Sequence, residues 1–215
     1  MQNYVDVAYD KKEKPITSYP DKLARYLYHR FSMKPGMKFL DNGCGRGEFL
    51  GAFARLGLET YGTDIVQGCK QTQLVNLNQD ELPFPEGTFD VVFSKSVIEH
   101  IEKQEHYMQE MRRVLKEDGL LIILVPDWKT QCIIFYEDPT HIHPYTQKSI
   151  DRLLNMMGFR EVSSEEFIQL PQVWKYPILK IVCRTLQFLG PVKRVYKNKF
   201  FRFSRELMIL GTGRK

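Results

Sequence analysis

The sequence lacks the features that mark membrane-spanning and secreted proteins. No run of about 20 apolar residues is present, and a bilayer-spanning helix needs one of that length. The first 14 residues, MQNYVDVAYDKKEK, contain no apolar signal core, so secretion is not expected. Cysteine is scarce, and the four cysteines show no metal-binding spacing, which predicts reduced thiols in a cytoplasmic protein. They are Cys44, Cys69, Cys132 and Cys183.

Acidic residues are almost absent from the last part of the chain. Residues 167–215 contain 11 Lys and Arg but only one acidic residue, Glu206, and so carry a charge of +10. Residues 1–166 contain 20 Lys and Arg and 25 Asp and Glu, which gives −5. The net charge of +5 therefore hides a basic tail that needs its own explanation. With 215 residues, of which 43% are hydrophobic, the chain can form one sizeable core.

The most informative segment that is present is glycine-rich, KFLDNGCGRGEFL at residues 38–50. It is typical of a buried strand, a G-x-G-x-G loop and the start of a helix, which together form a nucleotide-type cofactor site. Glu48 stands where a dinucleotide-binding loop has its third glycine, and its charge disfavours a phosphate. Asp64, 21 residues after Gly43, ends the next strand. Its carboxylate can accept hydrogen bonds from two ribose hydroxyls, although such an aspartate can also serve only as a cap.

Alternating strand and helix patterns predict a largely parallel sheet with helices on both faces. Helices are expected at residues 20–31, directly after the glycine loop, at 106–115 and at 146–157. Between the second and third strands there is room for barely one helical turn, so a crossover helix is missing there. The expected strands cover residues 39–42, 58–63, 71–77, 89–94, 120–125, 159–169 and 206–211.

Five segments together resemble class I S-adenosylmethionine-dependent methyltransferases, over residues 38–160. The resemblance implies a Rossmann-like seven-stranded α/β sheet, mostly parallel with an antiparallel last strand, and S-adenosylmethionine as cofactor with S-adenosylhomocysteine as product. It also implies an N-terminal segment and helix at 1–37 that cover the cofactor site. The methyltransferase domain would follow at 38–215, with inserts at 126–145 and 172–203. The five segments are residues 39–47, Asp64, Asn76 followed by LPFPEGTFDVVFS at 82–94, Glu99-His100-Ile101, and the Asp118-Gly119 turn.

The resemblance assigns the methionine end of the cofactor to the glycine loop. Asp41 and the backbone of Gly43 and Gly45 would hold the amine and carboxylate region. Cys44 and Gly47 would complete the cofactor-binding loop.

The nucleoside end would lie on the neighbouring strands. Asp64 would bind the ribose and Ile65 would lie against the adenine. Asn76 would accept a hydrogen bond from the adenine amino group through its amide oxygen, and Leu77 would pack on the ring. Ser94, at the tip of the fourth strand, would face the sulfonium.

Two classes of methyl acceptor are disfavoured by the residues after the fourth strand. The chain reads SKSV at 94–97, where amino-methylating enzymes that act on bases have an Asn-Pro-Pro-aromatic run. Glu99 is the only glutamate near the position where arginine methyltransferases have two. We therefore expect a hydroxyl acceptor on a small or lipid-linked molecule, such as a cell-envelope saccharide.

Three histidines are candidates for the base that removes a hydroxyl proton, because histidine titrates near neutral pH. His141 and His143 are favoured, since their segment DPTHIHPYT resembles that of methyltransferases acting on sugars, glycolipids and other small hydroxylated molecules. His100 is the third candidate, although a Glu-His pair there is often structural in the family. Asp138 with His141 and His143 could also form a metal site. No further ligand is evident, so no metal is expected.

The basic tail predicts an amphipathic helix at residues 173–189. It could be an insert that packs on the domain and covers the substrate, or residues 173–205 could contact an anionic membrane or a lipid-linked substrate. Nucleic acid is not expected as a partner, because the aromatics match no recognised RNA module. A binding-only relative and an RNA methyltransferase are the alternative functions. In the predicted helix at 173–189, the apolar face would contain Trp174, Ile178, Ile181, Val182 and Leu189. The polar face would contain Lys180, Arg184 and Gln187.

Overall fold

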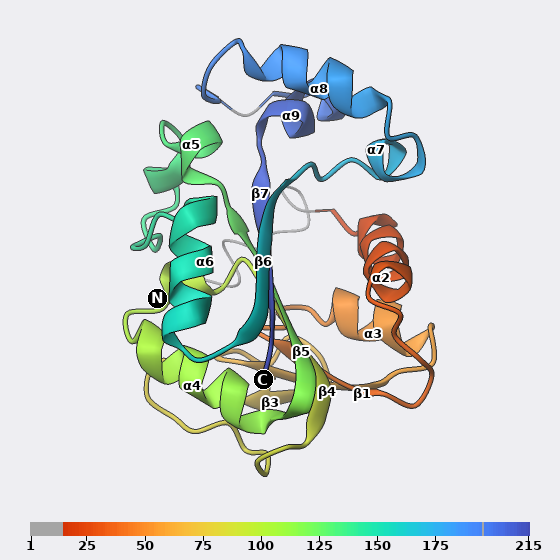
Figure 1. Cartoon of the computed structure of the whole chain (residues 1–215), viewed down its shortest axis with the longest axis vertical. Coiled ribbons are helices and arrows are strands. Elements are labelled where there is room, and N and C mark those ends of the chain that lie inside the picture. Colours follow the sequence, from red (N-terminus) through yellow and green to blue (C-terminus); the bar gives the residue numbers. More distant parts are fainter. Residues whose placement is uncertain (1–14, 195) are drawn as a thin grey trace.

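The computed structural model describes residues 15–194 and 196–215, which are built around a seven-stranded sheet (Figure 1). The strand order is β3-β2-β1-β4-β5-β7-β6. β7 runs antiparallel to β5 and β6, and the other pairings are parallel. The predicted sheet, mostly parallel with an antiparallel last strand, is thereby confirmed. The strands are β1 (Lys38–Asn42), β2 (Glu59–Asp64), β3 (Thr72–Leu74), β4 (Phe89–Lys95), β5 (Leu115–Pro126), β6 (Arg160–Phe167) and β7 (Met208–Arg214).

Helices cover both faces of the sheet, as predicted (Figure 1). One face is covered by α2 (Tyr19–Arg30) and α3 (Glu48–Ala54), and the other by α4 (Gln104–Val114) and α6 (Gln147–Met156). Successive side chains of a strand point to opposite faces, so the apolar run of β5 supplies both cores. Leu121 and Ile123 pack on the α4 side, and Ile122 and Leu124 pack on the α2 side.

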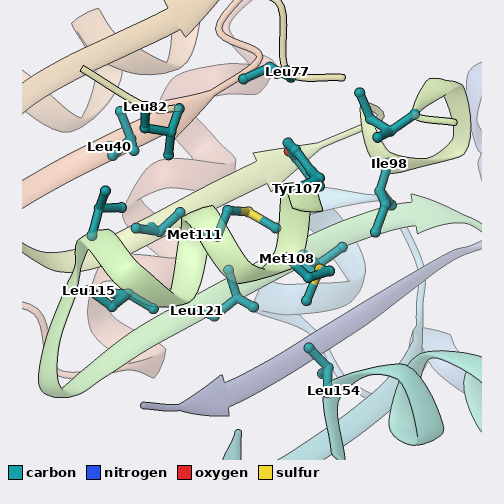
Figure 2. Close-up of a cluster of buried hydrophobic side chains, with 14 of the residues drawn as sticks. Leu40, Leu77, Leu82, Ile98, Tyr107, Met108, Met111, Leu115, Leu121 and Leu154 are labelled. Carbon is teal, nitrogen blue, oxygen red and sulfur yellow. The ribbon is translucent and has the colours of Figure 1, made fainter. Parts of the chain in front are cut away.

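The α4 side of the core is drawn in Figure 2. Tyr107, Met108 and Met111 project from α4 and are fully or almost fully buried. They gather with Leu121 of β5 and Leu154 of α6. Met111 lies three to four residues from Tyr107 and Met108, which places the three side chains on one side of α4. This cluster fixes α4 against β4 and β5, and so fixes the turn that connects β4 to α4.

The edge strand β3 is shorter than the strand expected at residues 71–77. β3 has three residues, whereas residues 71–77 were predicted to be extended. The chain turns instead at Asn76, whose side-chain oxygen accepts a hydrogen bond from the Asn78 N–H at 3.1 Å. The predicted absence of a crossover helix is confirmed, since residues 65–71 contain none.

The N-terminal helix does not cover the carboxyl edge of the sheet. α2 packs on α3 and against Trp174 of the basic tail. Among the described part of residues 1–37, nothing lines the cavity described below, so α2 does not fill the expected covering role. Residues 1–14, the rest of that expected segment, lie outside the described residues.

The basic tail forms three short helices rather than one amphipathic helix. α7 (Pro171–Lys175) and α8 (Leu179–Gln187) are separated at Pro177, which has no N–H to donate and whose ring disfavours a continuous helix. α9 (Lys199–Arg205) packs against α8 around the buried Cys183. These helices lie at one end of the molecule, beyond β6 and β7 (Figure 1). No described helix has the length and apolar character needed to cross a bilayer.

The start of α6 offers a direct test of local stability. Thr146 and Ser149 form a capping box, in which each side chain bonds the backbone N–H of the other residue. Thr146→Ala should lower the free energy of unfolding by about 1 kcal/mol, because the Ser149 N–H loses its side-chain acceptor and keeps only the Thr146 carbonyl, 3.0 Å away. Urea unfolding measures this change, with Thr146→Ser as the control that keeps the hydroxyl. An alanine variant as stable as the wild type would show that the cap contributes nothing.

Candidate cofactor and acceptor site

The glycine loop joins β1 to α3 with three residues at positive φ. Gly43, Gly45 and Gly47 have φ of +94°, +51° and +74°. The N–H groups of Gly43 and Cys44 both donate to the Thr63 carbonyl of β2, at 2.8 and 2.9 Å. A Cβ built on Gly43 would lie 2.3 Å from Val97 Cγ2. The positive φ and this close contact both favour glycine at position 43. The loop is therefore held tightly between β2 and the segment after β4.

A cavity of about 210 Å³ opens beside this loop, at the carboxyl ends of β1, β2 and β4. Six of the residues predicted for the site line it: Gly43, Asp64, Ile65, Asn76, Leu77 and His100. Five others were not predicted: Asn78, Ser96, Val97, Ile101 and Thr140. Ser96 and Val97 follow directly after β4, where the SKSV run could have indicated them.

Asp41 lies behind the loop with an unsatisfied oxygen. Its side chain is 2% exposed, and Oδ2 has no hydrogen-bond partner. Burial raises the pKa of Asp41 to about 8, and the nearby Asp64 carboxylate adds to the rise. A buried carboxylate with a vacant oxygen is a site that a cation would complete.

Asp64 faces the cavity in an orientation fixed by backbone groups. Its Oδ2 accepts from Gly45 N at 2.8 Å, and its Oδ1 accepts from Val66 N at 3.2 Å. Each oxygen retains a lone pair that a hydroxyl group could use. Ile65 follows with 63% of its surface exposed, although it is apolar and lines the cavity. A carboxylate beside an exposed apolar side chain suits a ribose that carries an aromatic base.

Five predicted cofactor residues lie outside the cavity lining: Asp41, described above, Gly45, whose N–H donates to Asp64, and Ser94, Cys44 and Gly47. Ser94 is fully buried, and its Oγ is 2.8 Å from the Tyr107 hydroxyl of α4, so the expectation that it faces the sulfonium is corrected. Its side chain points to the α4 face, as does that of Val92 two residues earlier, and Ser96, which lies beyond the end of β4 with a φ of +56°, lines the cavity instead. Cys44 is buried beneath the loop, with Sγ 3.4 Å from Thr72 Oγ1. Gly47 is the N-cap of α3.

His100 lines the cavity from η1 (Ile98–His100), the turn after β4. Thr140 Oγ1 donates to Asp138 Oδ1 at 2.6 Å, because an ionised carboxylate only accepts. Thr140 Oγ1 therefore accepts from His100 Nδ1 at 2.8 Å. This chain of hydrogen bonds assigns the ring proton to Nδ1 and leaves Nε2 as the basic nitrogen.

His141 packs against His100, with 4.7 Å between the ring centroids. Its Nδ1 donates to the Phe135 carbonyl at 2.7 Å, within an insert that also contains α5 (Trp128–Gln131) and η2 (Phe135–Glu137). His143 is not among the residues that line the cavity, and its backbone N–H donates to the Glu99 carbonyl at 3.2 Å. The structure thus brings two of the three candidate histidines together.

Glu99 is buried between these histidines and the sheet. It has no exposed surface, and neither carboxylate oxygen has a hydrogen-bond partner. Burial raises its pKa to about 8. Donor atoms of Glu99, His100 and His141 lie within 4.8 Å of one another. These three residues differ from the metal-ligand set that the sequence suggested, which was Asp138, His141 and His143. No pattern in the sequence indicated Glu99 as a ligand.

A larger hollow, of about 1070 Å³, lies between α2 and α7. No residue of the glycine loop and none of the candidate histidines lines it. Size alone therefore does not identify the functional site, and the smaller cavity holds the chemistry.

Residues 16–164 match a family described as methyltransferase domain, and this match covers more than half of the chain. The chain therefore belongs to that family. An uncharacterized protein of Methanocaldococcus jannaschii is 28% identical over 183 residues, which cover 80% of this chain and 79% of the relative. A ubiquinone biosynthesis O-methyltransferase of a Ruegeria species is 27% identical over 168 residues, which cover 66% and 68%.

A solved structure has the same fold over nearly the whole chain. The S-adenosylmethionine-dependent methyltransferase from Archaeoglobus fulgidus superposes with a TM-score of 0.68 at 21% identity, covering 99% of this chain and 100% of that one. The family and the fold together define a class I methyltransferase with S-adenosylmethionine as its cofactor.

The residues around the cavity fit this cofactor. The vacant Asp41 Oδ2 suits the methionine ammonium, and the Gly43 backbone lines the cavity beside it. Asp64 suits the ribose hydroxyls, and Ile65 and Leu77 offer apolar contact for the adenine. The Asn76 oxygen already accepts the Asn78 N–H, so it has one lone pair left for the adenine amino group.

We expect Asp41 to make cofactor affinity depend on pH. Without a cation the Asp41 carboxyl keeps its proton up to pH about 8, and binding an ammonium group requires the ionised form. Affinity for S-adenosylhomocysteine should therefore rise from pH 6 to pH 8, by at most about tenfold per pH unit. Calorimetry at several pH values measures this slope.

The matched variant is Asp41→Asn, which keeps the shape and removes the titration. It should bind more weakly at pH 8 and show a flatter slope. Equal slopes in the two proteins would contradict the role of Asp41. In the absence of cofactor, the folded wild type also holds a proton that the unfolded chain releases near pH 4. The contribution of Asp41 to the free energy of unfolding therefore falls as pH rises from about 4 to 8, and the variant should lose that part of the pH dependence.

Proposed function

We propose that this methyltransferase transfers its methyl group to a hydroxyl of a small or lipid-linked acceptor, such as a cell-envelope saccharide. The observation that carries this proposal is the position of His100. Its ring lines the cofactor cavity, and its Nδ1 proton is engaged by Thr140, which leaves Nε2 as the base. A hydroxyl nucleophile benefits from a base that accepts its proton near neutral pH, and imidazole is the side chain suited to that role.

The cofactor supplies an electrophilic methyl group on its sulfonium. Asp41 would hold its ammonium and Asp64 its ribose, which fixes the electrophile at the loop. His100 would accept the proton of the acceptor hydroxyl as the oxygen–carbon bond forms and the carbon–sulfur bond breaks, with S-adenosylhomocysteine as the leaving group. Most of the rate advantage of such a reaction comes from aligning the two reactants in the cavity.

His141 and Asp138 are proposed as positioning residues for His100. The His141 ring packs on the His100 ring, and the bond to the Phe135 carbonyl fixes its orientation. The Asp138 carboxylate, through Thr140, would stabilise the imidazolium that forms when His100 takes a proton. The geometry favours His100 over His143 as the base, the reverse of the order suggested by the sequence.

The test compares alanine variants of two histidines in an assay for S-adenosylhomocysteine release. The wild type is first presented with hydroxylated, amine-containing and lipid-extracted acceptors, and the methylated atom is located by NMR. His100→Ala should reduce turnover by about 10² to 10⁴-fold and leave cofactor affinity within a factor of about three. His143→Ala, the control histidine that does not line the cavity, should retain turnover close to that of the wild type.

Each other outcome has a definite meaning. Equal turnover of the His100→Ala protein would exclude His100 as the base. A methyl group on nitrogen would overturn the hydroxyl acceptor but not the methyltransferase. Cofactor binding without turnover on any acceptor would favour the binding-only alternative. Steeply salt-dependent binding to RNA, together with methylation of that RNA, would favour an RNA methyltransferase.

A further inference from the structure

The outer surface of α8 carries a stripe of apolar side chains in contact with solvent. Its members recur at intervals of three, four and seven along the chain, which places them on one side of the α8 segment. Their exposed fractions are 46–90%, so they are not part of the core. The stripe consists of Ile178 (70%), Ile181 (59%), Val182 (46%), Phe188 (90%) and Leu189 (60%).

The inward side of α8 is already occupied by other contacts. Leu179 and Cys183 pack with Phe200 and Phe203, both of which lie in α9. Gln187 Nε2 donates to the Ser204 carbonyl at 3.0 Å. The helix therefore satisfies its packing against the domain and leaves a second apolar side unpartnered. An exposed apolar stripe of this size indicates an interaction surface.

The segment that presents the stripe has a one-sided charge. Residues 171–205 contain nine Lys and Arg and no acidic residue. Two of these arginines are engaged internally: Arg202 pairs with Glu206, and Arg205 donates to the carbonyls of residues 189–191. The other seven are exposed, and they are Lys175, Lys180, Arg184, Lys193, Arg194, Lys197 and Lys199.

We propose that the α7–α9 helices dock this protein on the anionic surface of a lipid bilayer. The stripe would enter the boundary between headgroups and acyl chains, and the surrounding lysines and arginines would contact lipid phosphates. Charge complementarity selects this occupant, because an apolar stripe on a segment that contains cations and no acidic residue matches apolar chains beneath negative headgroups. A nucleic acid would use the cations but would leave the aliphatic stripe in water.

The position of α7–α9 in the fold is consistent with docking on a bilayer. They connect the carboxyl end of β6 to β7, and β6 runs parallel to β1, β2 and β4. The docking surface and the cofactor cavity therefore lie along the same edge of the sheet. A bilayer bound there would bring lipid-linked molecules to the edge at which the cavity opens. The docking itself does not depend on which acceptor is methylated.

Sedimentation of the full chain with vesicles tests the proposal. One set of vesicles is pure phosphatidylcholine, and the other contains phosphatidylglycerol as well. The wild type should bind the anionic vesicles at least tenfold more tightly than the neutral ones, and this binding should weaken as salt is added. Equal binding to both sets, or binding to neither, would overturn the proposal.

Two groups of variants separate the stripe from the charge. Ile178→Ser/Ile181→Ser/Phe188→Ser should lose at least tenfold in affinity for anionic vesicles, and Lys193→Gln/Arg194→Gln/Lys197→Gln should lose both affinity and salt dependence. The matched controls are Met156→Ser, which removes an equally exposed apolar side chain of α6, and Lys103→Gln/Lys148→Gln. Controls that bind as weakly as the test variants would contradict a defined surface.

Insertion of the stripe has its own readout. In a Phe188→Trp protein, tryptophan fluorescence should shift to the blue on anionic vesicles and be quenched by lipids brominated near the headgroup end of the acyl chain. An unshifted, unquenched spectrum would contradict insertion. Unchanged S-adenosylhomocysteine affinity in every variant shows that the fold is intact, so loss of vesicle binding reports on the surface alone.

Discussion

The close packing of the glycine loop is the constraint on which the site depends. The Gly43 backbone lies against Val97, and the Thr63 carbonyl accepts two N–H groups of the loop. Three strand ends are thereby fixed relative to one another: β1 through the loop, β2 through Thr63, and β4 through the turn that carries Val97. His100 lies three residues beyond Val97, so the same packing positions the candidate base relative to the cofactor loop. A change at Gly43 would therefore disturb the cofactor site and the acceptor site together.

Two buried acids with unsatisfied side-chain oxygens, Asp41 and Glu99, lie near this packed loop. Asp41 and Glu99 are both buried, and both have raised pKa values because burial disfavours their charged forms. Unsatisfied polar groups of this kind reduce the stability of a fold, and they gather where a ligand can complete them. In this chain they lie at one edge of the sheet, on either side of the loop and the histidines. The ammonium group of the cofactor suits Asp41, and the acceptor site would lie towards Glu99 and His100.

Much of the fold followed from local patterns in the sequence. The apolar runs of β4 and β5 and the glycine loop are determined by nearby residues, and they were predicted correctly. The break at Pro177 could have been read from the chain, but the apolar period of 173–189 concealed it. The direction of Ser94 depended on the register of β4, since a shift of one residue exchanges the two faces. The Asp138–Thr140–His100 chain joins residues about 40 positions apart, which no local pattern predicts.

The central claim is that the vacant oxygen of Asp41 receives the ammonium group of the cofactor beside the glycine loop. A crystal structure of the protein with S-adenosylhomocysteine tests it most directly. Our account predicts the amine nitrogen within hydrogen-bonding distance of Asp41 Oδ2, the ribose hydroxyls on Asp64, and the sulfur on the side of the cavity that His100 lines. A ligand bound in the hollow between α2 and α7, or an Asp41 that remains without a partner in the complex, would contradict it.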